Sequence, residues 1–395
     1  MKQHPWIVLI LILLLAWALR IVALDHWALW FDEGVSLTFG HMPLPEVVQF
    51  SNLWQDTNPP VHRQLMGRWT DLVGVTAFNA RLLSVLAGTL AVALTYRIAR
   101  QLGLAWPQVA AFLLAVAPMQ VYYSREAKSY AFTQLCLLVL VWLALNQFRQ
   151  NKPVIPPLAA GALSALAVFS AFGAHYMMAL GIIAIDLWVL WRSLILWRGP
   201  VEGVAQRAGA WFGGHVLGVL PILVWALLTL EGAQAGAANA ATDAALAPRG
   251  LLPYLFAHLS EYAAGPIAPD WLAISLATIL AAWLVISALP QATHRSREAS
   301  VLLWLWALLP IVLGFVAQIG VPFFFPRFLL FVTPAFALLS ADTASRLSSF
   351  QAIGWTLALT ALAGLALALA AHFTRTQNLP DLRPLAGELH GARQH

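Results

Sequence analysis

A pair of acids follows the first apolar segment of the chain and could do acid–base chemistry. Asp32 and Glu33 stand in the run LDHWALWFDEGVSL, a few residues after the apolar stretch ends. A carboxylate that is partly withdrawn from water can serve as a general base. Anionic headgroups repel acids at such a position, and the apolar boundary removes water from them. The presence of the pair therefore needs an explanation. A charged helix N-terminus or a solvated loop explains the pair equally well.

A second polar segment, SNLWQDTNPPVHRQLMGRW, follows in the same stretch of chain. The prolines after Asn58 fix a turn and then allow a helix to begin. Residues 62–73 place Leu65, Met66, Trp69 and Leu72 at helical spacing, which predicts an amphipathic helix lying in the membrane interface. Asp56 is either the acid that caps this helix or a second acid of the site, and capping is the simpler interpretation.

Three cations predict a phosphate site at the membrane surface. Arg125 and Lys128 stand three residues apart in APMQVYYSREAKSYAF and would share a helix face, while Arg327 lies among aromatic residues in VPFFFPRFLLFVTPAF. Arginine binds phosphate through a planar fork and lysine as a mobile point charge. Tyr130 could add stacking or a hydrogen bond. Ordinary snorkelling to headgroup phosphates, or an ion pair of Arg327 with an acid such as Asp32, is the alternative.

Two further polar residues lie in or beside apolar runs. His175, in GAHYMM, falls at the tip of a predicted helical hairpin, where a lone histidine is more often structural than catalytic. Asp186 falls within an apolar run, where burial opposite a polar group of a neighbouring helix is a simpler explanation than a proton or ion site. The sequence contains no zinc, nucleotide-binding or hydrolase motif, and the role of a divalent metal stays open.

The elements that must hold these residues are membrane-spanning helices. Of the 395 residues, 61% are hydrophobic and 10% are charged, and the mean hydropathy is +0.75. A soluble domain, with about 25% charged residues, has the polar side chains that this chain lacks. Apolar runs of about 20 residues recur, which is the length that crosses a bilayer as a helix. The net charge of +5 therefore indicates basic loops beside anionic lipid and no nucleic-acid partner. The single cysteine, Cys136, excludes an intrachain disulfide.

Eleven spans are predicted in an all-α fold. Their approximate bounds are 5–24, 81–96, 105–121, 131–148, 158–172, 177–196, 211–230, 271–290, 301–320, 329–344 and 353–372. The short loops on the N-terminal side carry Lys and Arg with few acids, which predicts a cytoplasmic N-terminus. Two long segments, about 25–80 and 231–270, then lie outside, and long segments tend to be functional. Residues 1–372 would form one membrane module, followed by a short outer tail, 373–395.

Taken together, the runs FDEGVS, DTNPPVH, RLLSVLAG, PMQVYYSREAKSYAF and PRFLLFVTP resemble the GT-C membrane glycosyltransferases. They are most similar to the bacterial group related to protein O-mannosyltransferases and to the lipid A aminoarabinose transferase. The resemblance implies a GT-C-like fold with interfacial helices in a long first outer loop. It also implies inverting transfer of a hexose or pentose from a polyprenyl-phosphate sugar to a lipid, glycan or protein acceptor. Such a site would lie on the periplasmic face of a bacterial inner membrane.

The resemblance also implies roles for individual residues. Asp32 matches the family's first-loop catalytic acid, which would deprotonate the acceptor hydroxyl, and Glu33 matches a neighbour that would orient the acceptor or a metal. Asn58 and Pro59 match a turn that shapes the site. The basic positions that would hold and stabilise the departing donor phosphate match Arg125, Lys128 and Arg327.

Two departures from the family pattern concern the acceptor. Relatives often have Pro-Pro-Leu-Tyr-Tyr where this chain has the more polar run Pro60-Val61-His62-Arg63. Many relatives also continue into an outer soluble domain, and the tail 373–395 looks like the first helix of such a domain.

Two other functions stay open. A lipid-linked glycan polymerase or ligase also has many spans and outer cations, but it usually lacks an acidic pair directly after the first span. A transporter or flippase of lipid-linked sugars typically shows paired repeats and helices broken at mid-membrane. The sequence shows neither feature.

Overall fold

The computed structural model describes residues 5–347 except 57, 150–151, 243–247, 290–295 and 320–324, with scattered residues between 362 and 373. Over these residues the chain forms helices and no strand. Helices satisfy every backbone group within one segment, as lipid requires. The predicted eleventh span, 353–372, and the predicted tail, 373–395, fall almost wholly outside the described residues.

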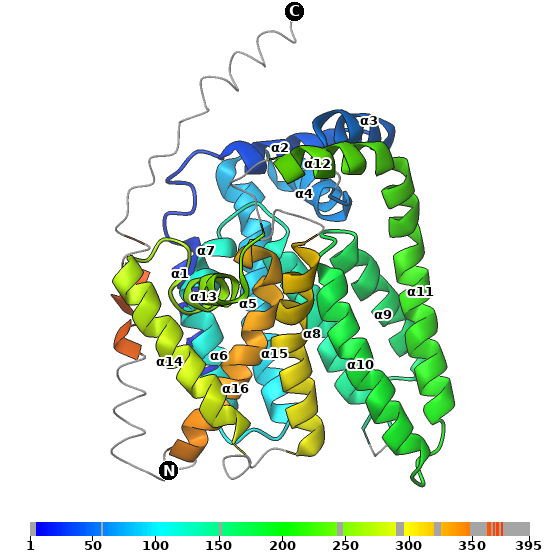
Figure 1. Ribbon diagram of the computed structural model, residues 1–395, viewed down its shortest axis with the longest axis vertical. Helices are drawn as coiled ribbons and strands as arrows, with labels where there is room; N and C mark the ends of the chain where they lie inside the picture. Colours follow the sequence, from blue (N-terminus) through cyan, green and yellow to red (C-terminus); the bar gives the residue numbers. More distant parts are fainter. Residues whose placement is uncertain are drawn as a thin grey trace, which may run out of the picture.

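The described apolar helices form one bundle (Figure 1). Those long and apolar enough to cross a membrane are α5 (Ala77–Gln101), α8 (Tyr130–Gln147), α10 (Met178–Trp197), α11 (Val204–Leu228), α14 (Asp270–Ala288), α15 (Arg297–Ala317) and the continuous pair η3 (Pro326–Val332) and α16 (Thr333–Leu347). Shorter apolar helices are α1 (Pro5–Ile21), α6 (Pro107–Val116) and α9 (Pro157–Phe172). Each overlaps one predicted span, so the prediction of a polytopic all-α fold is confirmed.

The predicted span 105–121 is wrong as a single helix. α6 ends at Val116, and a separate helix, α7 (Pro118–Tyr123), begins at Pro118, which has no N–H to continue the ladder. Arg20 of α1 satisfies carbonyl groups that this break leaves exposed, since its Nη1 donates to Ala115 O at 2.9 Å. Arg20 is completely buried, so it serves the joint between α1 and α6.

Asp186, the acid within the membrane-spanning part of α10, lies opposite polar groups of α11. Its Oδ1 accepts from Trp211 Nε1 at 2.8 Å and lies 3.2 Å from His215 Nε2. The expected pairing of Asp186 with polar groups of a neighbouring helix is therefore confirmed, although its side chain stays 25% exposed.

The first long loop folds into three helices at one end of the bundle: α2 (Phe31–His41), α3 (Leu44–Trp54) and α4 (Val61–Val73) (Figure 1). The second long segment forms α12 (Leu230–Thr242), which joins them there, and α13 (Leu251–Ala264), which packs against α7 and α14. Asn52 connects α3 to α12, because its amide nitrogen donates to Leu228 O and its oxygen accepts from Gly232 N–H.

α4 is amphipathic, as predicted, but polar residues at its start are buried, while Arg68 and Asp71 are exposed. His62, Arg63 and Thr70 are buried, whereas Leu65 and Leu72 are exposed, Leu72 to 83%. Met66, expected on the outward apolar face, is buried with the polar residues. An interfacial helix with apolar residues turned outward can present polar side chains to the protein interior.

α2 and α4 cross with their backbones in contact at two glycines. A Cβ atom on Gly40 would lie less than 3.0 Å from Arg63 O, and one on Gly67 would lie less than 3.0 Å from Gly40 O. Only glycine permits this approach. The crossing sets how far Asp32 on α2 lies from the residues at the start of α4.

We predict that Gly40→Ala destabilises the protein. Alanine favours an isolated helix by about 1 kcal/mol over glycine, but here it must displace α4, and such overpacking typically costs about 1–3 kcal/mol. The melting temperature in detergent measures the effect. Gly34→Ala on the same helix is the control, because no atom lies within 4 Å of its added Cβ. Equal melting temperatures for the two variants would contradict the close crossing.

Candidate active site

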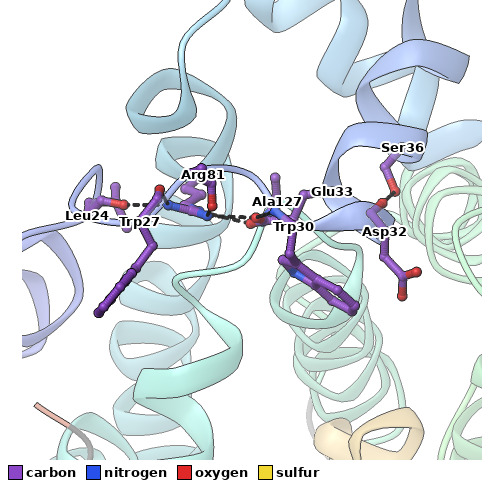
Figure 2. Close-up of polar contacts among 9 residues, drawn as sticks. Leu24, Trp27, Trp30, Asp32, Glu33, Ser36, Arg81 and Ala127 are labelled. Atoms are coloured by element: carbon purple, nitrogen blue, oxygen red, sulfur yellow. Dashed lines mark hydrogen bonds and ion pairs between the residues drawn. The ribbon is translucent and has the colours of Figure 1, made fainter. Parts of the chain in front are cut away.

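A buried ion pair between Glu33 and Arg81 joins α2 to the bundle (Figure 2). The Nε and Nη2 atoms of Arg81, on α5, donate to the two carboxylate oxygens of Glu33 at 2.9 and 2.7 Å. The Glu33 side chain is fully buried. A fork of two parallel charge-assisted hydrogen bonds is among the strongest side-chain contacts in proteins.

The backbone satisfies the other atoms of this pair. Glu33 accepts from the N–H groups of Trp30 at 3.2 Å and Ala127 at 2.7 Å. Arg81 donates, at 2.8–2.9 Å, to the carbonyl oxygens of Leu24, Trp27 and Ala28. The pair thus fixes the chain before α2, the first turn of α2 and the loop before α8 relative to α5.

Asp32 and Lys128, which lie next to this ion pair, contact each other in the wall of a cavity. Asp32 precedes Glu33 and points away from the pair, while Lys128 follows Ala127 (Figure 2). Lys128 Nζ lies 3.8 Å from Asp32 Oδ2 and donates to Ser36 Oγ at 3.4 Å. Burial lowers the pKa of Lys128, and the charge of Asp32 acts in the opposite direction.

The cavity has a volume of about 240 Å³ and lies between the ends of α2, α4, α8 and η3. Its walls are Phe31, Asp32, Val35, Ser36, Asp56, Asn58, His62, Arg63, Lys128, Ser129, Tyr130, Ala174, His175, Arg327 and Phe328. Seven of the nine residues that the sequence nominated are in this set, and they come from five separate stretches of chain. Glu33 and Arg125 are not in it.

Asp56 forms an ion pair with Arg63 and does not cap α4. Arg63 Nη2 donates to Asp56 Oδ2 at 2.5 Å, and Asn58 Nδ2 donates to Asp56 Oδ1 at 3.0 Å. No side chain caps the N-terminus of α4, where Pro60 stands, so the capping interpretation of Asp56 is wrong. Burial raises the pKa of Asp56, but the charge of Arg63 and these hydrogen bonds outweigh burial and hold the pKa below its usual value.

The buried His62 and the half-buried His175 complete the wall and are neutral. Burial, with the charges of Lys128 and Arg63, lowers the pKa of His62 to about 3. Burial, with the charges of Lys128 and Arg327, lowers that of His175 to about 3. Met177 N–H donates to His175 Nδ1 at 3.2 Å, so the neutral ring carries its hydrogen on Nε2.

Arg327 lies among aromatic rings at the other side of the cavity. Its Cζ lies 4.4 Å from the centroid of the Phe325 ring and 5.6 Å from that of Phe328. Its Nε has no hydrogen-bond partner among the described residues. Tyr130 and Asp32 both lie within range of its charge. A guanidinium held in this way is available to an anionic group in the cavity.

The structure gives two nominated residues other contacts. Arg125 donates to the carbonyl oxygens that end α1, with Nη1 2.6 Å from Val22 O and Nη2 3.2 Å from Ala23 O. Glu33 is occupied by Arg81 and backbone amides. The geometry therefore does not support a phosphate-binding role for Arg125, or a role for Glu33 in holding the acceptor or a metal.

Arg63 and His62 were not among the residues nominated from the sequence. The signal that could have identified them is the departure of the Pro60-Val61-His62-Arg63 run from the family pattern.

Within the described ranges, the structure brings together no group of three His, Cys, Asp or Glu side chains able to hold a metal ion.

We predict that Glu33→Gln lowers stability strongly. The substitution leaves Arg81 buried without its counter-charge, and breaking a buried ion pair from one side costs about 3–5 kcal/mol. The melting temperature in detergent measures this loss, and Asp32→Asn, one residue away, should leave it nearly unchanged. A Glu33→Gln protein that melts with the wild type would argue against a structural role for Glu33.

Comparisons with known proteins agree with this architecture. Residues 57–205 match the family model of dolichyl-phosphate-mannose-protein mannosyltransferases. No curated protein sequence matches the chain. ArnT from Cupriavidus metallidurans, solved with undecaprenyl phosphate, is 17% identical with a TM-score of 0.55, and the alignment covers 96% of this chain and 68% of ArnT.

Two other solved structures share the fold. The oligosaccharyltransferase of Archaeoglobus fulgidus is 15% identical with a TM-score of 0.58, over 94% of this chain and 56% of its own. The mycobacterial arabinofuranosyltransferase AftD is 16% identical with a TM-score of 0.53, over 95% of this chain and 27% of its own. The chain thus shares the fold of these three membrane glycosyltransferases and, over residues 57–205, is similar to the mannosyltransferase family.

Proposed function

We propose that this chain transfers a sugar from a polyprenyl-phosphate donor to a hydroxyl group of a lipid, glycan or protein acceptor. The observation that carries the proposal is the convergence of Asp32 with Lys128 and Arg327 in one cavity beside the membrane-spanning helices. ArnT was solved with undecaprenyl phosphate, and the Archaeoglobus enzyme with a dolichol phosphate and an inhibitory peptide. Both relatives support a lipid-linked donor.

In the proposed reaction, the acceptor hydroxyl attacks the anomeric carbon while the bond from that carbon to the phosphate oxygen breaks. Asp32 takes the hydroxyl proton, and the polyprenyl phosphate leaves as an anion. Lys128 and Arg327 stabilise the charge that develops on the phosphate, as oriented cations do in a site that excludes water. A single displacement with one base on the acceptor side inverts the anomeric configuration.

The contact between Lys128 and Asp32 gives donor binding a second effect. Lys128 Nζ lies 3.8 Å from Asp32 Oδ2. A phosphate in the cavity competes for Lys128, and this leaves the Asp32 carboxylate free to accept the hydroxyl proton. The base then becomes available when the donor is in place.

The position of the site supports an extracytoplasmic reaction in a bacterial inner membrane. α2, α3, α4 and α12 cover the same end of the bundle as the cavity (Figure 1). The short loops at the other end carry Lys and Arg with few acids, which is typical of the cytoplasmic side. The site's acids and cations gather at one end, which favours transfer over transport, since transporters place such groups at mid-membrane.

We predict that Asp32→Asn abolishes sugar transfer. Loss of a general base lowers the rate about 10²–10⁴-fold, and binding of the sugar-bearing polyprenyl phosphate should persist. The measurements are transfer of radiolabelled sugar by purified protein and donor binding by the same sample. Asp25→Asn is the matched control, because this acid is exposed and lies outside the cavity. Full transfer by Asp32→Asn would remove the assignment of Asp32 as the base.

We predict that Arg327→Ala weakens donor binding by about 10–100-fold, the scale of one hydrogen bond to a charged group. The dissociation constant for polyprenyl phosphate measures the effect. Arg68→Ala is the control, because this side chain is 80% exposed and lies outside the cavity. An unchanged dissociation constant would assign the phosphate to other residues.

A further inference from the structure

Two adjacent residues at the start of α4 line the cavity, and each has a buried hydrogen-bonding atom without a partner in the described part of the chain. His62 is 3% exposed and Arg63 is 6% exposed, and both line the cavity. His62 Nε2 and Arg63 Nη1 have no hydrogen-bond partner among the described residues. Buried polar atoms are usually paired in folded proteins, so these two atoms are the candidates on this wall for pairing with a polar group of a ligand.

Arg63 is held firmly while one of its nitrogens stays open. Its Nη2 donates to Asp56 Oδ2 at 2.5 Å, and its Cζ lies 4.9 Å from the centroid of the Phe39 ring. Asn58 holds the other Asp56 oxygen. The guanidinium is therefore fixed in position by its neighbours, and a fixed donor discriminates between ligands better than a mobile one.

The charges around the cavity indicate that the group at this wall is uncharged. Two acids, Asp32 and Asp56, and three bases, Arg63, Lys128 and Arg327, line the cavity, which gives a net charge of +1 with neutral histidines. The phosphodiester of a sugar-bearing polyprenyl phosphate carries one negative charge and balances this excess. A further charge on the sugar would be left unbalanced in a partly buried site, which is unfavourable.

The size of the cavity places a sugar ring against α4. A volume of about 240 Å³ is below the range of about 300–1,000 Å³ that is usual for drug-sized ligands. One oxygen joins the sugar to the phosphate, so a phosphate held by Lys128 and Arg327 brings the ring into the same small space. A hydroxyl group both donates and accepts, so it pairs with the N–H of Arg63 and with either tautomer of His62.

We infer that Asp56, His62 and Arg63 form the sugar subsite of the donor and select an uncharged monosaccharide by its hydroxyl groups. This inference rests on the proposed function. It gives Asp56 a second role, because the Asp56 carboxylate orients Arg63. Arg63 Nη1 and His62 Nε2 are the atoms that contact the sugar.

The experiment compares polyprenyl phosphate with the same lipid carrying a sugar, and measures the dissociation constant of each with purified protein. Arg63→Lys keeps a cation for Asp56 but removes the second nitrogen, and His62→Phe keeps a ring against Phe132, whose centroid lies 5.7 Å away. Each should weaken binding of the sugar-bearing lipid about tenfold, the scale of one lost hydrogen bond. Binding of the sugar-free lipid should change by less than about twofold.

The control is Arg68→Lys, the same exchange at an exposed position of the same helix. A panel of neutral hexosyl and pentosyl lipids, with a uronosyl and an aminosugar lipid beside them, tests the preference for an uncharged ring in the wild type. Tightest binding of a charged sugar, or an equal loss of both lipids in Arg63→Lys and His62→Phe, would overturn the inference. If the wild type bound neither the sugar-free nor any sugar-bearing lipid, the proposed function itself would fail.

Discussion

The arrangement of this site depends on one buried ion pair, between Glu33 and Arg81. Withdrawing two charges from water is unfavourable, and their attraction offsets the loss only when hydrogen bonds satisfy their remaining atoms. Here two backbone N–H groups complete Glu33, and three carbonyl groups complete Arg81. Because those groups belong to segments far apart in sequence, the pair sets their relative positions. Asp32 directly precedes Glu33, and Lys128 directly follows Ala127, so the ion pair also positions the proposed base and a proposed phosphate ligand.

A second constraint is the glycine contact between α2 and α4. The carbonyl oxygens of Arg63 and Gly40 occupy the space that side chains at Gly40 and Gly67 would need. This contact brings the polar wall of His62 and Arg63 to the cavity that Asp32 lines. Together with the ion pair, it makes the cavity the meeting point of two anchored helices. Asp32 itself stays 36% exposed and pairs loosely with Lys128, as a group that must exchange a proton requires.

The sequence predicted the fold class and seven of the fifteen residues that line the cavity, for identifiable reasons. Apolar runs of span length fix the helices, because lipid leaves the backbone no alternative. Residues Asp32, Lys128 and Arg327 were found because each stands at the end of an apolar run, where a charge needs an explanation. The same reasoning failed for Glu33 and Arg125, because the sequence does not distinguish a structural charge from a functional one at the end of an apolar run. Only the partners, Arg81 and the carbonyl groups ending α1, separate the two roles, and those contacts span up to 106 positions in sequence.

The membrane boundary explains why His62 and Arg63, at the start of α4, face the protein interior. A lipid-linked phosphate is confined to the interface by its apolar chain, so the groups that act on it must be brought to that depth. α4 meets this need with exposed leucines on one side and buried His62 and Arg63 on the other. Its hydrophobic pattern predicted an amphipathic helix, but such a pattern has two sides, and only packing reveals that His62 and Arg63 face protein. The paired charges within the cavity then leave one positive charge in excess, which a single phosphodiester would neutralise. Under the proposed function, a site with this balance would bind its lipid-linked donor without drawing a second anion from the surrounding headgroups.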